Sequence, residues 1–217
     1  KRCINQVRYD NGKAQFIYRN HFTCYDWNKH NQKEGFVEDI TLSFHDENQH
    51  PVAQLARAYI DKNKWIKQLK PQAIRLQNNS IEEHTKRLNA LHHEADKLSG
   101  GFSTVPYIPL NTLFDRSGKP NLYLFKQIPN AAIIEIVRPN WDLTQEIGTH
   151  LNISHLGFAI WENGTLMFRN ASSTHQQVID TPLIEYLHEA LKSPTIKGIN
   201  IQVVPPNPKG LNHCLGR

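Results

Sequence analysis

Two segments of alternating hydrophobic and polar residues, joined by Asn163-Gly164, form the clearest pattern in the chain. Asn-Gly is the strongest short-range signal of a two-residue β-hairpin, because both central residues of a type I′ turn need a positive φ. The pattern predicts a hairpin over residues 153–173. The length of the turn also fixes its register, with Glu162 opposite Thr165.

This register places two polar side chains near each other. Counting back from the turn puts His155 opposite Ser172, so that Asn170 is the diagonal neighbour of His155 on the same face, at roughly 7–8 Å between backbones. An imidazole beside a carboxamide is the pair of general base and orienting residue in a nucleophilic triad. A lone histidine on an apolar strand is otherwise a packing residue. Small neighbours that leave room for a substrate favour the catalytic interpretation: Ser154, Gly157, Ala171, Ser172 and Ser173.

The pattern before the hairpin predicts two helices. Apolar residues at helical spacing indicate a first helix that begins at Pro51 and ends at Pro71. Ser80 and Glu83 form a capping box at the start of a second helix, which Gly100-Gly101 is expected to close. These two helices predict a helical subdomain.

Strand patterns surround this helical segment. Residues 36–44, 131–137 and 198–204 read as strands, and a further helix is expected after Pro182. The mixture predicts an α+β fold with a small, mostly antiparallel sheet or half-barrel. We expect three parts: the N-terminal part of a catalytic domain (1–49), an inserted helical subdomain (50–104) and a β-rich catalytic domain (105–217).

Composition limits the classes of function. A chain of 217 residues with 39% hydrophobic and 21% charged residues is long enough for a real core. It has no run of 18 apolar residues, so no membrane span is expected. A net charge of +5 and a pI near 9.1 favour acidic surroundings such as anionic wall polymers, phospholipid or nucleic acid. The basic residues are scattered, without interleaved aromatic residues, and we therefore expect no nucleic acid partner.

The cysteines and histidines do not form a metal-binding pattern. Cys3, Cys24 and Cys214 are far apart and no CxxC occurs, which argues against zinc and iron–sulfur sites. The twelve histidines include no HExxH motif. We expect no metal and no cofactor. The odd number of cysteines leaves at least one thiol unpaired and leaves the redox compartment open.

Several motifs then occur in a recognisable order. They are Tyr107-Ile108-Pro109, IVRPNWDL (136–143), GTHLNISHLGFAI (148–160), RNASS (169–173) and VIDTPLIEYL (178–187), preceded by QVRYDNG (6–12) and RNHF…DW (19–27). Together they resemble a bacterial family of N-acetylmuramoyl-L-alanine amidase-like proteins, within the papain-like NlpC superfamily of cell-wall cysteine amidases and peptidases. The resemblance covers most of the chain and implies a papain-like (NlpC-type) core.

The resemblance also implies roles for particular residues. Such enzymes use a cysteine thiolate at a helix N-terminus, a histidine base on a strand and a third polar residue on the next strand. His155 matches the base. The third residue is typically a histidine before Ala-Ser-Ser, and here it is Asn170, which can orient an imidazole as in papain-like sites. Residues expected to bind substrate are Ser154, Ser172, Ser173, His21 and Trp27.

The nucleophile has no clear counterpart. In the family it stands in an Asn- or Asp-Cys motif upstream of the segment that corresponds to Arg8, and only seven residues precede Arg8 here. We therefore expect the nucleophile to lie upstream of Lys1, in a part of the protein that this sequence does not include. The alternative is Cys24, flanked by His21 and His30, which would lower the pKa of a thiol.

The resemblance implies an enzyme that hydrolyses the amide bond between N-acetylmuramic acid and L-alanine in peptidoglycan fragments (muropeptides). Two alternatives stay open: an endopeptidase of the same fold that cuts the γ-D-glutamyl bond of the stem peptide, and a catalytically inactive muropeptide-binding module. A cell-wall substrate implies a periplasmic or secreted protein, although the first residues lack the apolar region of a signal peptide. The oligomeric state is left open.

Overall fold

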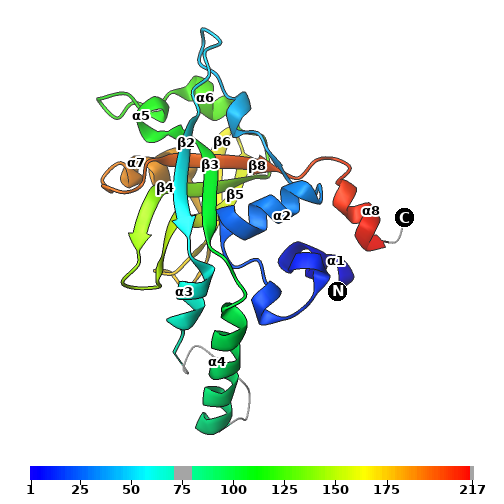
Figure 1. Cartoon of the computed structure of the whole chain (residues 1–217). Helices are drawn as coiled ribbons and strands as arrows, with labels where there is room; N and C mark the ends of the chain where they lie inside the picture. Colours follow the sequence, from blue (N-terminus) through cyan, green and yellow to red (C-terminus); the bar gives the residue numbers. More distant parts are fainter. Residues whose placement is uncertain (71–79, 216–217) are drawn as a thin grey trace.

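The computed structural model describes residues 1–70 and 80–215, and these ranges build an open sheet of eight strands (Figure 1). The order across the sheet is β2-β3-β8-β4-β5-β6-β7, with β1 also paired to β8, and all of these pairings are antiparallel. The strands are β1 (Glu38–Asp39), β2 (Gln54–Ile60), β3 (Gly101–Pro109), β4 (Ala132–Leu143), β5 (Thr149–Glu162), β6 (Thr165–Ser172), β7 (Gln177–Pro182) and β8 (Gly198–Val203).

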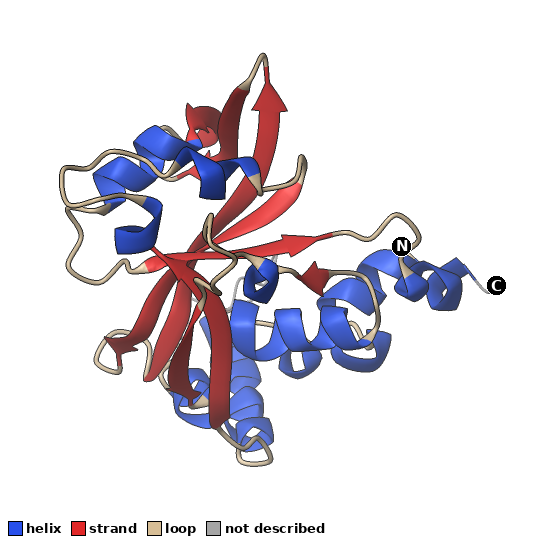
Figure 2. Ribbon diagram, turned by 90° about the horizontal axis from the view of Figure 1, so that it is seen from above, coloured by secondary structure: helices blue, strands red, loops and turns tan. Residues whose placement is uncertain are grey.

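Helices flank the sheet on both sides (Figure 2). They are α1 (Arg2–Arg8), α2 (Asn28–Lys33), α3 (Lys62–Lys67), α4 (Ile81–Ala95), α5 (Leu110–Leu113), α6 (Leu122–Lys126), α7 (Leu183–Ala190) and α8 (Lys209–Leu215). Short 3₁₀ turns form η1 (Asp10–Gly12), η2 (Phe16–Tyr18) and η4 (Thr41–Ser43), and a π-helical turn forms η3 (Thr23–Trp27). Helices α1 and α8 lie beside each other near the two termini, and α3 and α4 pack together beyond one end of the sheet (Figure 1). Of the helices in the described ranges, none has the length and apolar character needed to cross a membrane.

The main hydrophobic core lies on one face of the sheet. Ile134 and Ile136 of β4 point into it and are fully buried. Phe125 of α6 and Leu183 and Leu187 of α7 cover them from the other side. Burial of this apolar surface is the main force that holds these helices on the sheet.

The opposite face carries a smaller, more polar core under η3 and α2. Cys24 packs there against Val137, the residue of β4 that follows Ile136 and points to the other side of the sheet. The carboxyl group of Glu135 is fully buried on this face and accepts hydrogen bonds from Asn28 Nδ2 (2.9 Å) and Gln202 Nε2 (3.2 Å). The two faces of β4 and β5 therefore provide different chemical environments.

The prediction of a helix that begins at Pro51 is wrong for residues 54–60, because these residues form β2. This strand pairs along its whole length with β3. Its buried residues are Ala56, Ala58 and Ile60, at every second position, as expected for a strand with one covered face. A short apolar run fits both a helical and a strand period, and the pairing with β3 decides between them. The expected end of that helix at Pro71 lies outside the described residues.

The capping box of α4 is confirmed, because Ser80 and Glu83 exchange the two expected hydrogen bonds. The expected closure at Gly100-Gly101 is wrong: α4 ends at Ala95, and Gly101 begins β3. The strand predicted over 36–44 is shorter than expected, since η4 follows β1.

The mixed α/β composition of the fold is confirmed, but the open sheet is larger than the small sheet or half-barrel expected. Within the described part of residues 50–104, helix is confined to α3 and α4, and β2 belongs to the sheet. The division of the chain at residues 49 and 104 stays a prediction, as does the papain-like arrangement of the core.

Candidate active site

The β5–β6 hairpin positions the candidate catalytic pair. Asn163 and Gly164 at its tip have φ angles of 49° and 81°, as a type I′ turn requires. The pairing of Glu162 with Thr165 is confirmed. The ladder continues to Gly157 opposite Asn170, which fixes the face on which Asn170 lies.

The structure brings His155 and Asn170 into direct contact. His155 Nε2 lies 2.9 Å from Asn170 Oδ1, and the Asn170 side chain is buried. Asn170 Nδ2 donates to the carbonyl oxygen of Phe168 (3.3 Å), so Oδ1 is the atom that faces the imidazole. Because Oδ1 can only accept, Nε2 carries the proton, and Nδ1 is the ring atom that is free to accept one in the neutral histidine. A general base needs such a free nitrogen to take a proton from the nucleophile.

His155 and Asn170 lie in the wall of a cavity of about 340 Å³. Three further residues predicted for the site lie in the same wall: Ser154, Ser172 and Ser173. Ser172 Oγ accepts from the backbone N–H of His175 (3.2 Å) and lies 2.9 Å from its Nδ1, at the end of β6. The small side chains leave the space beside the imidazole open.

Sequence reasoning missed two functional candidates in this wall, Arg138 and Tyr186. A signal for the first existed, because Pro139 follows the strand predicted over 131–137 and indicates that regular pairing is interrupted there. Tyr186 lies on α7 and is half-buried at the cavity. Trp141 also lines the cavity.

His21 and Trp27 do not join the site as expected. Both line a separate cavity of about 260 Å³ together with Leu156 and Phe158. These two residues alternate with His155 and Gly157 along β5, and therefore point to the other face of the sheet. Whether His21 and Trp27 contact a substrate stays a prediction, but they do not do so in the His155 cavity.

His21 lies in an aromatic environment, and burial there lowers its pKa. Its ring lies 4.7 Å from that of Trp65 and 4.5 Å from that of Phe16, and its Nε2 lies 2.8 Å from the carbonyl oxygen of Phe16. Burial disfavours the charged imidazolium and lowers the pKa of His21 to about 4. The ring of His21 is therefore neutral at pH 7 and packs within an aromatic cluster.

The thiol of Cys24 is unsuited to act as the nucleophile beside His155. It is only 6% exposed, and it packs with Val137 on the face of the sheet opposite the cavity. Burial raises the pKa of Cys24 to about 11, so the thiolate is scarce at neutral pH. Cys3 is disulfide-bonded.

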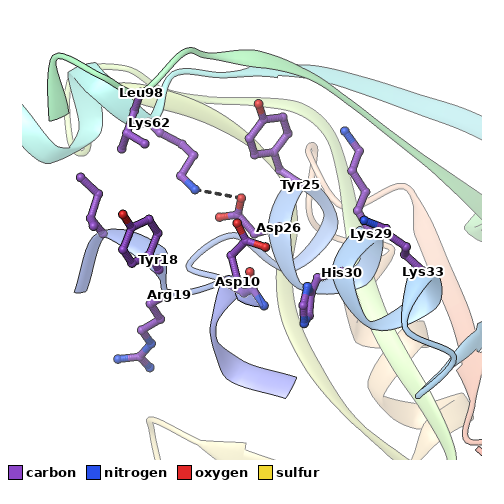
Figure 3. Close-up of a pocket in the computed structure, with 12 residues that line it drawn as sticks. Asp10, Tyr18, Arg19, Tyr25, Asp26, Lys29, His30, Lys33, Lys62 and Leu98 are labelled. Atoms are coloured by element: carbon purple, nitrogen blue, oxygen red, sulfur yellow. Dashed lines mark hydrogen bonds and ion pairs between the residues drawn. The ribbon is translucent and has the colours of Figure 1, made fainter. Parts of the chain in front are cut away.

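A second large cavity, of about 380 Å³, lies between the N-terminal segment and α2 (Figure 3). Figure 3 shows Asp10 and Asp26 near its centre, with Lys62 extended toward Asp26. Lys62 Nζ binds Asp26 Oδ1 at 3.0 Å, and both side chains are largely shielded from solvent. Its described wall contains two acidic and four basic residues, and no base there is paired with an orienting amide: the acids are Asp10 and Asp26, and the bases are Arg19, Lys29, Lys33 and Lys62. The candidate active site is therefore the His155 cavity. Among the described side chains, no group of three or more His, Cys, Asp or Glu is arranged to hold a metal ion.

Fold and cavity together define a mixed α/β protein whose open antiparallel sheet carries a histidine–asparagine pair at a polar cavity. The chain belongs to the AmiA-like family, described as N-acetylmuramoyl-L-alanine amidase-like, whose model matches residues 1–196. A search of curated protein sequences finds no match.

Two solved structures are similar to this chain. A protein of Legionella pneumophila is 54% identical, with a TM-score of 0.92; the match covers 94% of this chain and 68% of that one. An N-acetylmuramoyl-L-alanine amidase of Bacteroides uniformis is 23% identical, with a TM-score of 0.56; the match covers 92% of this chain and 70% of that one. At that identity the second likeness establishes the fold alone.

Proposed function

We propose that the protein is a peptidoglycan amidase that hydrolyses the bond between N-acetylmuramic acid and L-alanine. The observation that carries this proposal is the contact between His155 and Asn170 at an open cavity, in a member of an amidase-like family. Membership of that family suggests hydrolase activity on cell-wall material. The specific bond is inferred from the family's description.

The proposed chemistry is nucleophilic catalysis by a cysteine. His155 Nδ1 takes the proton of the thiol, and the thiolate attacks the carbonyl carbon of the lactyl amide. The tetrahedral intermediate collapses to a thioester as Nδ1 returns that proton to the leaving amine of L-alanine. Water, deprotonated by the same nitrogen, then hydrolyses the thioester. Asn170 keeps the imidazole in the tautomer that this cycle requires.

We place the attacking thiol on residues that precede Lys1, as the sequence resemblance implies. Two observations support this: the described wall of the cavity contains no cysteine, and Cys24 faces the other side of the sheet. A cell-wall substrate places the protein outside the cytoplasm. The disulfide at Cys3 supports an oxidising compartment.

The test is incubation of the full gene product, and of the 217-residue chain, with a purified disaccharide–tetrapeptide. Mass spectrometry should detect free tetrapeptide with the full product, and His155→Ala should abolish its release. His150→Ala is the matched control, because His150 lies on the same strand outside the cavity. Release of a disaccharide–dipeptide would instead identify a γ-D-glutamyl endopeptidase. Binding without cleavage by the full product would identify a muropeptide-binding module, and either result would overturn the proposal.

A further inference from the structure

An irregular stretch of β4 places Arg138 at the candidate active site. The pairing of β4 with β5 shifts register twice between Ile136 and Trp141. Within this stretch Asn140 has a φ of 49°, and Pro139 has no backbone N–H to offer a neighbouring strand. Such bulges bend a strand and redirect its side chains, often beside functional sites. As a result, the Arg138 side chain lies in the wall of the His155 cavity.

The guanidinium group of Arg138 is held in place but incompletely paired. Its central carbon lies 4.5 Å from the centre of the Trp141 ring, which supports one side of the group. Its Nη1 donates to Thr195 Oγ1. Its Nε is buried without an acceptor, and no described residue accepts a hydrogen bond from Nη2. Nε is covered by the protein, so the donors of this guanidinium group that are left for a ligand are Nη2 and the second hydrogen of Nη1.

The charge of Arg138 is also uncompensated within the cavity. Among the described residues of its wall there is no aspartate and no glutamate, and Arg138 carries the one permanent charge. Burial raises the pKa of Tyr186 in the same wall, while the positive charge of Arg138 opposes that rise. The cavity is therefore suited to an anionic group.

We propose that Arg138 forms a carboxylate-binding subsite for the α-carboxylate of D-glutamate, the second residue of the stem peptide. This inference rests on the proposed function, because it takes a muramoyl peptide as the ligand. Nη2 and the second hydrogen of Nη1 provide two donors that match the two oxygens of a carboxylate, which an arginine can bind end-on. With that carboxylate fixed, the amide one residue earlier lies toward His155. Arg138 is a positioning and specificity residue and takes no part in breaking the bond.

The test compares two ligands that differ at one group. N-acetylmuramoyl-L-alanyl-D-glutamate carries the free α-carboxylate, and N-acetylmuramoyl-L-alanyl-D-isoglutamine carries a carboxamide of nearly the same shape. Calorimetric titration of the 217-residue chain at pH 7 and low salt should give roughly ten- to a hundredfold tighter binding of the carboxylate ligand, the range for a hydrogen bond to a charged group. Arg138→Gln should bind the two ligands equally. Arg138→Lys should retain part of the preference.

The matched control is Arg57→Gln. Arg57 also stacks on an aromatic ring, at 3.8 Å from the centre of Phe102, but it is exposed on β2 and does not line the cavity. This variant removes one positive charge and should keep the preference of the wild type. Equal binding of both ligands by the wild type, or an unchanged preference in Arg138→Gln with an unchanged melting temperature, would overturn the inference.

A second probe separates this inference from the proposed function. N-acetyl-D-glutamate and N-acetyl-D-isoglutamine present the same carboxylate and carboxamide without muramic acid. If neither muramoyl dipeptide binds, the proposed substrate is wrong. If N-acetyl-D-glutamate alone still shifts the NMR signal of the Trp141 indole N–H, and Arg138→Gln removes that shift, the carboxylate subsite stands on its own. If that signal does not move, the subsite is wrong as well.

Discussion

His155 Nε2 and Asn170 Oδ1 lie 2.9 Å apart across the β5–β6 hairpin, although the residue paired with Asn170 is Gly157. The contact is thus diagonal. It requires the correct register of the two strands and side chains long enough to span the distance between diagonal positions. It defines which nitrogen of the imidazole is protonated.

Replacement of Asn170 tests this relationship directly. In the wild type we expect the neutral His155 ring to carry its proton on Nε2, as ¹⁵N NMR of the ring nitrogens would show. Asn170→Ala should yield a mixture of tautomers and lower kcat by roughly ten- to a hundredfold, less than the 10²–10⁴-fold contribution of a general base. An unchanged tautomer in the variant would contradict the orienting role of Asn170.

Gly157 is expected to be essential to the geometry of the pair. A Cβ at this position would lie 2.5 Å from the Arg169 carbonyl oxygen and 2.9 Å from Asn170 Cβ. Gly157→Ala should therefore displace Asn170 and destabilise the protein by about 1–3 kcal/mol, as overpacking of a well-packed core does. Thermal unfolding and the His155 tautomer measure the two effects.

Gly164→Ala is the matched control on the same hairpin. Gly164 has a φ of 81° but no atom within 4 Å of an added Cβ, so its replacement strains the backbone only. It should cost about 1 kcal/mol of stability and leave the His155 tautomer unchanged. Equal effects of both variants on the tautomer would show that Gly157 has no special role.

The half-buried His21 predicts a loss of stability in acid. Its pKa is about 4 in the folded protein and about 6.5 when the chain unfolds. The unfolded chain therefore binds the proton more tightly, and the free energy of unfolding falls as pH decreases from 6.5 toward 4, by roughly 3 kcal/mol at most. Urea unfolding at pH 7 and pH 4.5 should show a smaller difference for His21→Gln than for the wild type. The same difference in both proteins would refute this origin.

For Glu135 we expect the opposite effect: the free energy of unfolding should fall as pH rises. Full burial raises its pKa from 4.5 to about 8, although Asn28 and Gln202 donate hydrogen bonds to it. The folded protein then holds a proton that the unfolded chain releases, so this contribution to stability is present below pH 4.5 and is lost as pH rises toward 8.

Glu135→Gln removes the ionisation and should be more stable than the wild type at pH 8.5, by about 1 kcal/mol or more, while differing little at pH 5. Asn28 Oδ1 has no partner and can accept from the new amide after a flip of the Asn28 side chain. A variant less stable than the wild type at both pH values would show that Glu135 is needed in its ionised form.

Cys24 should react slowly with alkylating reagents. Its burial and its pKa of about 11 keep the thiol protonated and covered in the folded protein. Iodoacetamide at pH 8 should modify Cys24 rapidly in urea and only at the rate of unfolding in buffer. Rapid modification of the folded chain would reopen the assignment of Cys24 as a nucleophile.

The parts of the site that obey local rules were predictable from the sequence. The Asn163-Gly164 turn defines its own register, and that register led to His155 and Asn170 without knowledge of any other strand. Ser154 and Ser172 follow from the same two strands, and Ser173 is the residue after β6.

What escaped prediction depends on contacts between distant parts of the chain. Ala56, Ala58 and Ile60 become a strand because β3 lies beside them, and their spacing alone fits a helix as well. His21 resembles a site residue in sequence, yet Trp65 and Phe16 enclose it on the far side of the sheet. Arg138 reaches the cavity through a bulge that its pairing with β5 produces.

The exposed tip of the hairpin has a consequence for how the protein can vary. Because side chains alternate between faces, one additional residue in the turn, if not absorbed as a bulge, would bring Arg169 or Ala171 to the place of Asn170. Two additional residues would preserve the alternation. We therefore expect homologous proteins to tolerate changes of residue type on the surface of β6. Insertions in the β5–β6 turn should contain an even number of residues, because an odd number would move Asn170 away from His155.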